Sequence, residues 1–291
     1  MPSDEISAHG HPQLTVAGGA PLVWGRRTYV MGIVNLTPDS FSGDGLNGDV
    51  ATAVALAQRM EMEGADIIDV GAESTRPGSA PVTEDEEIAR LLPALTAICE
   101  AVSIPVSVDT YKAEVARRAI AAGAAMINDV WGTLADPDMA WVVADAGVPA
   151  ILMHNRREAR YDDLVPDVIV GLRRIADHAR AAGILERNII LDPGIGFGKT
   201  ADHNLELLRR LPELRSLEYP LLLGVSRKST IGRVLGLPEN ERLEGTAAAV
   251  AMSIAGGADI VRVHDVRAMA RVARMTDAIV RDWRPEGWPN R

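Results

Sequence analysis

The chain has 291 residues, of which 47% are hydrophobic and 24% charged, and its formal net charge is −10. This composition is typical of a globular protein with a sizeable core, and the acidic balance argues against a nucleic-acid surface, which is normally basic. Cys99 is the only cysteine, which excludes an intrachain disulfide and a thiolate metal cage, and no apolar stretch reaches the roughly 18 to 20 residues of a membrane helix. We therefore expect a cytoplasmic protein with no membrane association.

Short β-branched apolar runs alternate along the chain with longer amphipathic stretches, and this alternation predicts parallel β–α–β units. The eight predicted strands are Tyr29–Val34, Asp66–Val70, Pro105–Val108, Ala125–Asn128, Val148–Met153, Ile189–Leu191, Pro220–Gly224 and Asp259–Val263. The clearest predicted helices are Val50–Glu63, Glu84–Ala101, Ala113–Ala122, Leu164–Ala182 and Ala201–Leu211. Eight units in a chain of this length predict an α/β fold, a closed (β/α)8 TIM barrel.

The barrel is predicted to be one domain over residues 13–283, flanked by a flexible N-terminus (1–12) and a C-terminal tail (284–291). Residues 13–28 contain two short apolar pieces around a Gly-Gly pair. This pattern predicts a short N-terminal β-hairpin that covers the floor of the barrel. Gly64, Gly123 and Gly257 each precede a predicted strand, as expected where a helix ends.

A polar residue follows each predicted strand. These residues are Asn35, Glu73, Asp109, Asn128, His154, Asp192, Ser226, Arg227, Lys228 and His264. Helix capping explains one such residue, but it does not explain the whole series. Because the carboxyl ends of barrel strands converge on the face that carries the active site, we predict that these side chains share one pocket.

Asp109, Asn128 and Asp192 follow strongly apolar segments, so partial burial obliges them to find hydrogen-bond partners. Acceptors that face a cleft suit a flat heterocycle with an amino group and ring N–H groups, and Lys228 can donate to its carbonyl or ring nitrogen. A metal site built from the same carboxylates is less favoured, because no HExxH, EF-hand or His-pair spacing is present.

Arg262 and His264 alternate in the sequence V-R-V-H-D, which directs both side chains to one face of the last strand. With Asn35 from the adjacent first strand, they predict a phosphate or pyrophosphate site. Arg262 alone fits an internal ion pair equally well.

Residues 37–48 and 74–81 are rich in Gly, Pro and Ser and are predicted to be mobile covers, with Arg76 adding positive charge near a leaving group. Residues 194–200 lack the P-loop spacing. Their glycines are expected to let the backbone approach a ligand, with Phe197 as an apolar wall. No arrangement for covalent catalysis is evident, so the expected chemistry is positioning and stabilisation of a departing anion.

Taken in order over about residues 29–266, several segments closely resemble the bacterial dihydropteroate synthase family. They are MGIVNLTPDSFSGDG, IIDVGAESTRPG, VSVDT, MINDV, ILMH, ILDPGIGFGKT, LLLGVSRKSTIG and VRVHDV. The resemblance implies that 6-hydroxymethyl-7,8-dihydropterin pyrophosphate reacts with 4-aminobenzoate to give 7,8-dihydropteroate and pyrophosphate. This folate-synthesis step is the target of sulfonamides, and the resemblance also implies a homodimer paired through helices of the last third.

The same resemblance implies a role for individual residues. The pterin would be held by Asp109, Asn128, Met153, Asp192 and Lys228. The pyrophosphate would be bound by Asn35, Arg262 and His264, with Mg²⁺ near Asn35 and Asp39. The arylamine pocket would be formed by Thr75, Arg76, Pro77, Phe197 and Ser229. The residues expected to act in catalysis are Asp39, Thr75, Arg76 and Lys228.

Two alternatives remain. One is the pterin-binding module of a methyltransferase that passes a methyl group to a cobalt cofactor, although such modules lack the combination of TPDSF, STRPG and SRKS. The other is a catalytically silent paralogue that binds the pterin without turnover. Residues 155–163, after the predicted fifth strand, also depart from the family pattern.

Overall fold

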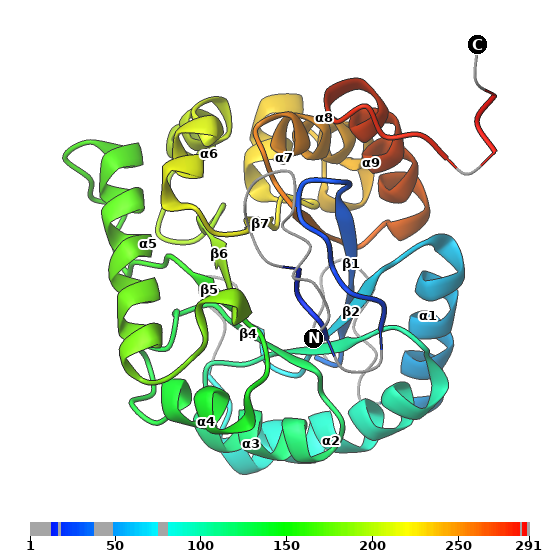
Figure 1. Ribbon diagram of the computed structural model, residues 1–291, viewed down its shortest axis with the longest axis vertical. Helices are drawn as coiled ribbons and strands as arrows, with labels where there is room; N and C mark the ends of the chain where they lie inside the picture. The colour runs from blue at the N-terminus through cyan, green and yellow to red at the C-terminus, as the bar shows by residue number, and fades with distance from the viewer. Residues whose placement is uncertain (1–12, 17–18, 38–48, 75–80, 286, 290–291) are drawn as a thin grey trace, which may run out of the picture.

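The computed structural model of the chain describes residues 13–16, 19–37, 49–74, 81–285 and 287–289. Within these residues, parallel strands form one eight-stranded sheet in the order β6-β5-β4-β3-β2-β1-β8-β7. The strands are β1 (Tyr29–Asn35), β2 (Ile67–Gly71), β3 (Val106–Asp109), β4 (Met126–Asp129), β5 (Ala150–Met153), β6 (Ile189–Asp192), β7 (Leu222–Leu223) and β8 (Ile260–Val263). A parallel bridge between Leu191 and Leu221 joins the two edges, so the sheet forms the barrel at the centre of Figure 1.

Helices form a ring outside the sheet (Figure 1). They are α1 (Val50–Glu63), α2 (Glu84–Ala101), α3 (Ala113–Ala121), α4 (Met139–Ala146), α5 (Leu164–Ala181), α6 (Ala201–Arg209), α7 (Ser229–Leu235), α8 (Leu243–Ala255) and α9 (Val266–Val280). Short 3₁₀ turns are η1 (Glu186–Asn188), η2 (Leu211–Leu217) and η3 (Glu239–Glu241). The predicted (β/α)8 barrel is confirmed, and each of the eight strands and five helices predicted with bounds is present within two residues at either end.

Local chemistry explains the limits of several helices. Helix α1 begins where the Asp49 side chain accepts a hydrogen bond from the amide of Ala51 at 3.1 Å, which satisfies one of the free amides of the first turn. Gly64, Gly123 and Gly257 have φ of +102°, +110° and +108°. This left-handed conformation, which glycine adopts without steric cost, turns the chain from a helix into the next strand as predicted.

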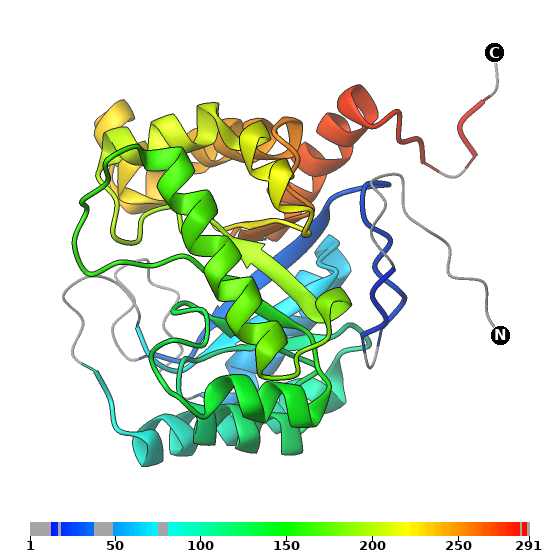
Figure 2. The ribbon, with the colours of Figure 1, turned by 60° about the vertical axis from the view of Figure 1, so that its left-hand side comes forward.

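The predicted hairpin is present as a single pair of hydrogen bonds. The amides of Leu14 and Leu22 donate to each other's carbonyls at 2.9 and 2.8 Å, and residues 17 and 18 at the predicted turn lie outside the described residues. In Figure 2 this segment (dark blue) covers one end of the barrel. Its side chains pack on the amino-terminal halves of the strands in one apolar cluster: Leu14, Val16, Leu22, Trp24, Tyr29, Met31, Ile67, Ala125, Met126, Ile151, Ile190, Leu222 and Ile260.

A larger apolar cluster lies between the sheet and the helices. Because the N-terminal segment covers the amino-terminal ends of the strands, the polar carboxyl ends lie at the opposite end of the barrel. No helix in the described ranges is long and apolar enough to cross a membrane. The predicted N-terminal segment 1–12 and most of the two predicted covers fall outside the described residues. The limits of the domain at residues 13 and 283 stay predictions.

Replacing Trp24 with Ala should destabilise the fold. Its indole is 1% exposed and meets the ring of Tyr29 edge-on at 5.7 Å, so truncation leaves a cavity that costs about 3 to 5 kcal/mol. Urea denaturation followed by circular dichroism measures this loss. The control is Trp141→Ala on α4, because the Trp141 side chain is 57% exposed and its removal should change the free energy of unfolding by about 0.5 kcal/mol or less. Equal losses in the free energy of unfolding for the two variants would contradict a stabilising role of the N-terminal segment that contains Trp24.

Candidate active site at the carboxyl ends of the strands

A hollow of about 280 Å³ opens at the carboxyl ends of the strands. It is lined by these predicted site residues: Asn35, Asp109, Phe197, Lys228, Ser229, Arg262 and His264. The hollow therefore contains residues from strands β1, β3 and β8 and from the connections after β6 and β7. Of the polar strand ends expected to share a pocket, this hollow contains Asn35, Glu73, Asp109, Ser226, Lys228 and His264. The individual roles of the site residues stay predictions.

Arg262 lies at the base of this hollow between two carboxylates. Its Nε is 2.5 Å from Asp69 Oδ2 and its second guanidinium nitrogen is 2.8 Å from Asp109 Oδ2. The amide of Asn128 also donates to Asp69 Oδ2, at 3.1 Å. Of the two interpretations that the sequence allowed for Arg262, the structure therefore contains the internal ion pair. Asp69 was missed, although a carboxylate in the apolar segment I-I-D-V-G already signals a buried partner.

Burial shifts the protonation of the two predicted pterin carboxylates. It raises the pKa of Asp109 to about 7, against the opposing charge of Arg262. It also raises the pKa of Asp192 to about 6, against the hydrogen bond from the amide of Gly194, at 2.7 Å, and the charge of Lys228. Asp109 Oδ1 is buried and has no hydrogen-bond partner among the described residues, so it can accept an N–H group from a ligand.

The Lys228 side chain is positioned by the loop that carries it. Arg227 has a φ of +56°, which is uncommon for a residue with a side chain, and ion pairs at 3.0 and 2.8 Å hold its guanidinium on Asp265. Lys228 Nζ lies 4.3 Å from the centroid of the Phe197 ring, a distance at which a cation and an aromatic face attract. The loops after β6 and β7 therefore meet at this pair.

His264 and Asn35 line the side of the hollow nearest β1 and β8. His264 Nδ1 is 3.0 Å from the hydroxyl of Ser226, and its amide donates to the same oxygen at 3.2 Å. Arg242 also lines the hollow, a contribution that the sequence did not reveal because this arginine precedes α8 and follows no strand. Arg242, Arg262 and His264, three of the four basic side chains that line the hollow, favour an anionic ligand here.

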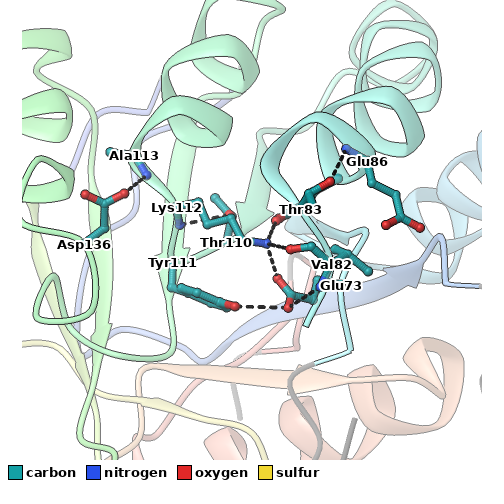
Figure 3. Close-up of polar contacts among 10 residues, drawn as sticks. Glu73, Val82, Thr83, Glu86, Thr110, Tyr111, Lys112, Ala113 and Asp136 are labelled. Carbon is teal, nitrogen blue, oxygen red and sulfur yellow. Dashed lines mark hydrogen bonds and ion pairs between the residues drawn. The ribbon is translucent and has the colours of Figure 1, made fainter. Parts of the chain in front are cut away.

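A second polar cluster lies at the start and end of the connection between β2 and α2 (Figure 3). Lys112 Nζ is 2.6 Å from a carboxylate oxygen of Glu73 and of Glu87, and it donates to the carbonyl of Val82 at 2.9 Å. The hydroxyl of Tyr111 donates to Glu73 at 3.0 Å. Burial raises the pKa of Glu87. Lys112 thus holds together the two ends of a connection whose second residue, Glu73, lines the hollow.

The remaining predicted residues fall into three groups. Asn128, Met153 and Asp192 are buried and do not line the hollow, and Met153 pairs with Asp192 in the sheet. His154 does not line the hollow. It is buried, and burial lowers its pKa to about 3, so its imidazole is neutral. The residues outside the described part of the chain are Asp39, Thr75, Arg76 and Pro77.

Asn35 supplies an amide oxygen at the rim of the hollow. Mg²⁺ in enzymes commonly keeps several waters and takes only one or two protein oxygens together with substrate phosphates. A rim oxygen beside the basic groups that favour an anion is compatible with that mode of binding. Within the described part of the chain, no group of three or more His, Cys, Asp or Glu side chains forms a metal cage.

Comparison with known proteins agrees with this geometry. The family model of pterin binding enzymes matches residues 31–264. A dihydropteroate synthase of Clostridium beijerinckii is 54% identical over 258 residues, which are 88% of this chain and 96% of the relative.

Solved structures agree in fold. A Clostridium difficile dihydropteroate synthase determined in the presence of pteroic acid has a TM-score of 0.85 and 47% identity, covering 89% of this chain and 98% of that one. A Xanthomonas albilineans dihydropteroate synthase with 4-aminobenzoic acid has a TM-score of 0.86 and 41% identity, covering 96% and 100%. The chain therefore belongs to the dihydropteroate synthases within the family of pterin binding enzymes.

Proposed function

We propose that this transferase condenses 6-hydroxymethyl-7,8-dihydropterin pyrophosphate with 4-aminobenzoate to give 7,8-dihydropteroate and pyrophosphate. One observation carries the proposal: a buried carboxylate oxygen of Asp109 lacks a hydrogen-bond donor among the described residues, and Asp109 lines a hollow that also contains basic side chains. A heterocycle with N–H groups and an anionic substituent satisfies both features at once. Small molecules are therefore the proposed partners, and the cytoplasm is the proposed location.

The pterin end comprises Asp109, Asn128, Asp192 and Lys228, with Met153 against the ring. The carboxylates accept hydrogen bonds from the amino group and ring N–H groups, and Lys228 donates to a ring nitrogen or carbonyl. Support comes from the burial of the carboxylates and the raised pKa values of Asp109 and Asp192. Groups that are costly to keep charged gain most from a ligand that supplies donors.

The anion end comprises Asn35, Arg262 and His264. Because Arg262 already pairs with Asp69 and Asp109, its role here is to bring positive charge close to the leaving group as well as to orient Asp109. We propose that Asn35 and Asp39 hold Mg²⁺ against the pyrophosphate, with Asp39 outside the described residues. When bound, the ion neutralises negative charge that develops on the departing pyrophosphate.

The arylamine end comprises Phe197, Ser229 and residues Thr75, Arg76 and Pro77, of which the last three lie outside the described residues. In the proposed reaction the bond between the pterin methylene carbon and the pyrophosphate oxygen breaks first, and its electron pair leaves with pyrophosphate. The amine nitrogen then forms the new bond to carbon and releases one proton. Positioning and charge stabilisation suffice for this sequence, and it requires no covalent nucleophile from the protein.

We also propose that two copies pair through α7 and α8. Apolar side chains are exposed on this side of the barrel, with Val234 61% and Met252 57% accessible, and they border an apolar hollow of about 360 Å³ with α6. Exposed apolar surface of this kind commonly marks a protein interface, and a second copy is the occupant that the family resemblance implies.

Replacing Val234 with Glu should separate the two copies, because a carboxylate in the centre of an apolar contact loses its hydration. Sedimentation equilibrium should give twice 31.1 kDa for the wild type and the mass of one chain for the variant. Val170→Glu on α5, where the side chain is 49% exposed, should remain paired. A wild-type mass of one chain would contradict the proposed dimer.

The reaction is tested by mixing purified protein with the pterin pyrophosphate, Mg²⁺ and 4-aminobenzoate. Pyrophosphate and 7,8-dihydropteroate should form in equal amounts, and a chelator should slow both, because the proposed ion stabilises the leaving group. Binding of the pterin without either product would instead support a silent paralogue. Methyl transfer from a methylated pterin to a cobalt cofactor would support the methyltransferase alternative.

Replacing Asp192 with Asn should weaken pterin binding by about 1.5 to 3 kcal/mol, the usual contribution of a hydrogen bond to a charged group. Asp192 Oδ1 accepts the amide of Gly194 at 2.7 Å, so the asparagine oxygen keeps this bond and its NH₂ group replaces the acceptor that faces the ligand. Calorimetry without arylamine measures the dissociation constant. Asp202→Asn, on exposed α6 surface, should leave it unchanged, and equal affinity for Asp192→Asn and wild type would remove Asp192 from the pterin site.

A further inference from the structure

The loops after β5 and β6 touch backbone to backbone. A Cβ atom at Gly194 would lie 2.1 Å from the carbonyl oxygen of His154, and one at Gly198 would lie 2.3 Å from that of Arg156. Both glycines have a positive φ, +74° and +54°. The hydroxyl of Tyr161 adds a hydrogen bond to the carbonyl of Gly198 at 2.9 Å. The two loops therefore form one unit that only glycine permits at its closest points.

Lys199 is the cation inside this unit. Its Nζ donates to the carbonyls of Phe197, at 3.1 Å, and His154, at 3.4 Å, and it lies 3.2 Å from Nδ1 of the same histidine. Because the His154 imidazole is neutral, Nδ1 can accept a hydrogen bond from the ammonium group. Lys199 thus links the two loops through three acceptors.

The choice of lysine is informative because this chain rarely uses it. Only three of its 30 basic residues are lysines, namely Lys112, Lys199 and Lys228. A guanidinium is planar and larger, whereas an ammonium is a compact charge with three donors. At position 199 three acceptors lie within 3.4 Å of Nζ, which matches the three donors of an ammonium group.

Lys199 is connected to the candidate site on two sides. One of the two carbonyls that Lys199 binds belongs to Phe197, whose ring centroid lies 4.3 Å from Lys228 Nζ. The amide of His154 donates to the carbonyl of Asp192 at 2.9 Å, and the amide of Gly194 donates to the Asp192 side chain at 2.7 Å. The loops that Lys199 joins therefore contact Asp192 and contain Phe197, whose ring in turn contacts Lys228.

We propose that Lys199 is a positioning residue for the pterin end of the site, holding the β5–α5 and β6–α6 loops together so that Asp192 and Lys228 meet the ligand in a fixed geometry. This inference rests on the proposed function, because it takes Asp192 and Lys228 as pterin ligands. Burial lowers the pKa of Lys199 to about 7, opposed by the charge of Asp192, as expected for an ammonium group withdrawn from water.

The test compares pterin pyrophosphate binding, measured by calorimetry without arylamine, in wild type, Lys199→Met and Lys199→Gln. Removal of the groups that orient metal-binding residues typically changes metal affinity roughly 10- to 100-fold, and we expect a rise of similar size in the dissociation constant of the pterin for Lys199→Met. Lys199→Gln keeps a donor for one carbonyl, so its dissociation constant should lie between those of the wild type and Lys199→Met. Arg118→Met removes a cation from the exposed face of α3 and should bind as the wild type does.

Two further measurements separate positioning from folding. Binding is measured well below the unfolding midpoint of each variant, so that a purely structural role lowers the midpoint and leaves the dissociation constant of the folded protein unchanged. Tyr161→Phe deletes one hydroxyl from the same unit, and if Lys199→Met does not fold, this variant should still weaken pterin binding severalfold. Wild-type affinity in every folded variant of Lys199 and Tyr161 would overturn the inference, whereas failure of the wild type to bind the pterin would overturn the proposed function itself.

Discussion

The ion pairs of Arg262 with Asp69 and Asp109 inside the barrel are the interaction on which the rest of the site depends. Charges withdrawn from water are costly unless they are paired and hydrogen bonded, and removing one partner of a buried pair typically costs about 3 to 5 kcal/mol. Asp109 and Arg262 of this group line the hollow at the carboxyl ends of the strands. At the opposite end, the N-terminal segment and the strand residues that it covers form an apolar cluster.

This arrangement leaves two carboxylate oxygens of the network without a donor among the described residues. Arg262 donates to one oxygen of each carboxylate, and Asn128 donates to the same oxygen of Asp69. The second oxygens of Asp69 and Asp109 are buried and have no donor among the described residues. Such atoms raise the free energy of the empty protein. In the proposed function a ligand with N–H groups relieves that cost at Asp109, and specificity for a hydrogen-bonding heterocycle then follows from unsatisfied acceptors as much as from shape. A site of this kind strongly disfavours an analogue that lacks the N–H groups.

The sequence predicted what depends on local pattern and missed what depends on pairing across the barrel. Strand ends such as Asp109 and Asp192 were recognised because an apolar run stops at a polar residue, and the glycines that end helices were recognised for the same local reason. Asp69 was missed because its partner, Arg262, is far away in the chain and meets it only when β1 lies between β2 and β8. His154 follows its strand as the others do, but the chain turns its ring away from the hollow, and the sequence contains no signal for that direction.

The loop at residues 155–163, which departs from the family pattern, can be understood from the same contacts. Lys199 and the two glycines meet mainly backbone carbonyls of His154 and Arg156, and a backbone carbonyl is present whatever side chain the residue carries. Tyr161 is the side chain of this segment that reaches the neighbouring loop, through Gly198. The sequence of the loop can therefore vary while the geometry around Asp192 persists, provided that the path of its first residues and one hydroxyl are retained. A change of sequence at residues 155–163 is thus compatible with an intact site, because the neighbouring loop contacts mainly the backbone of this segment.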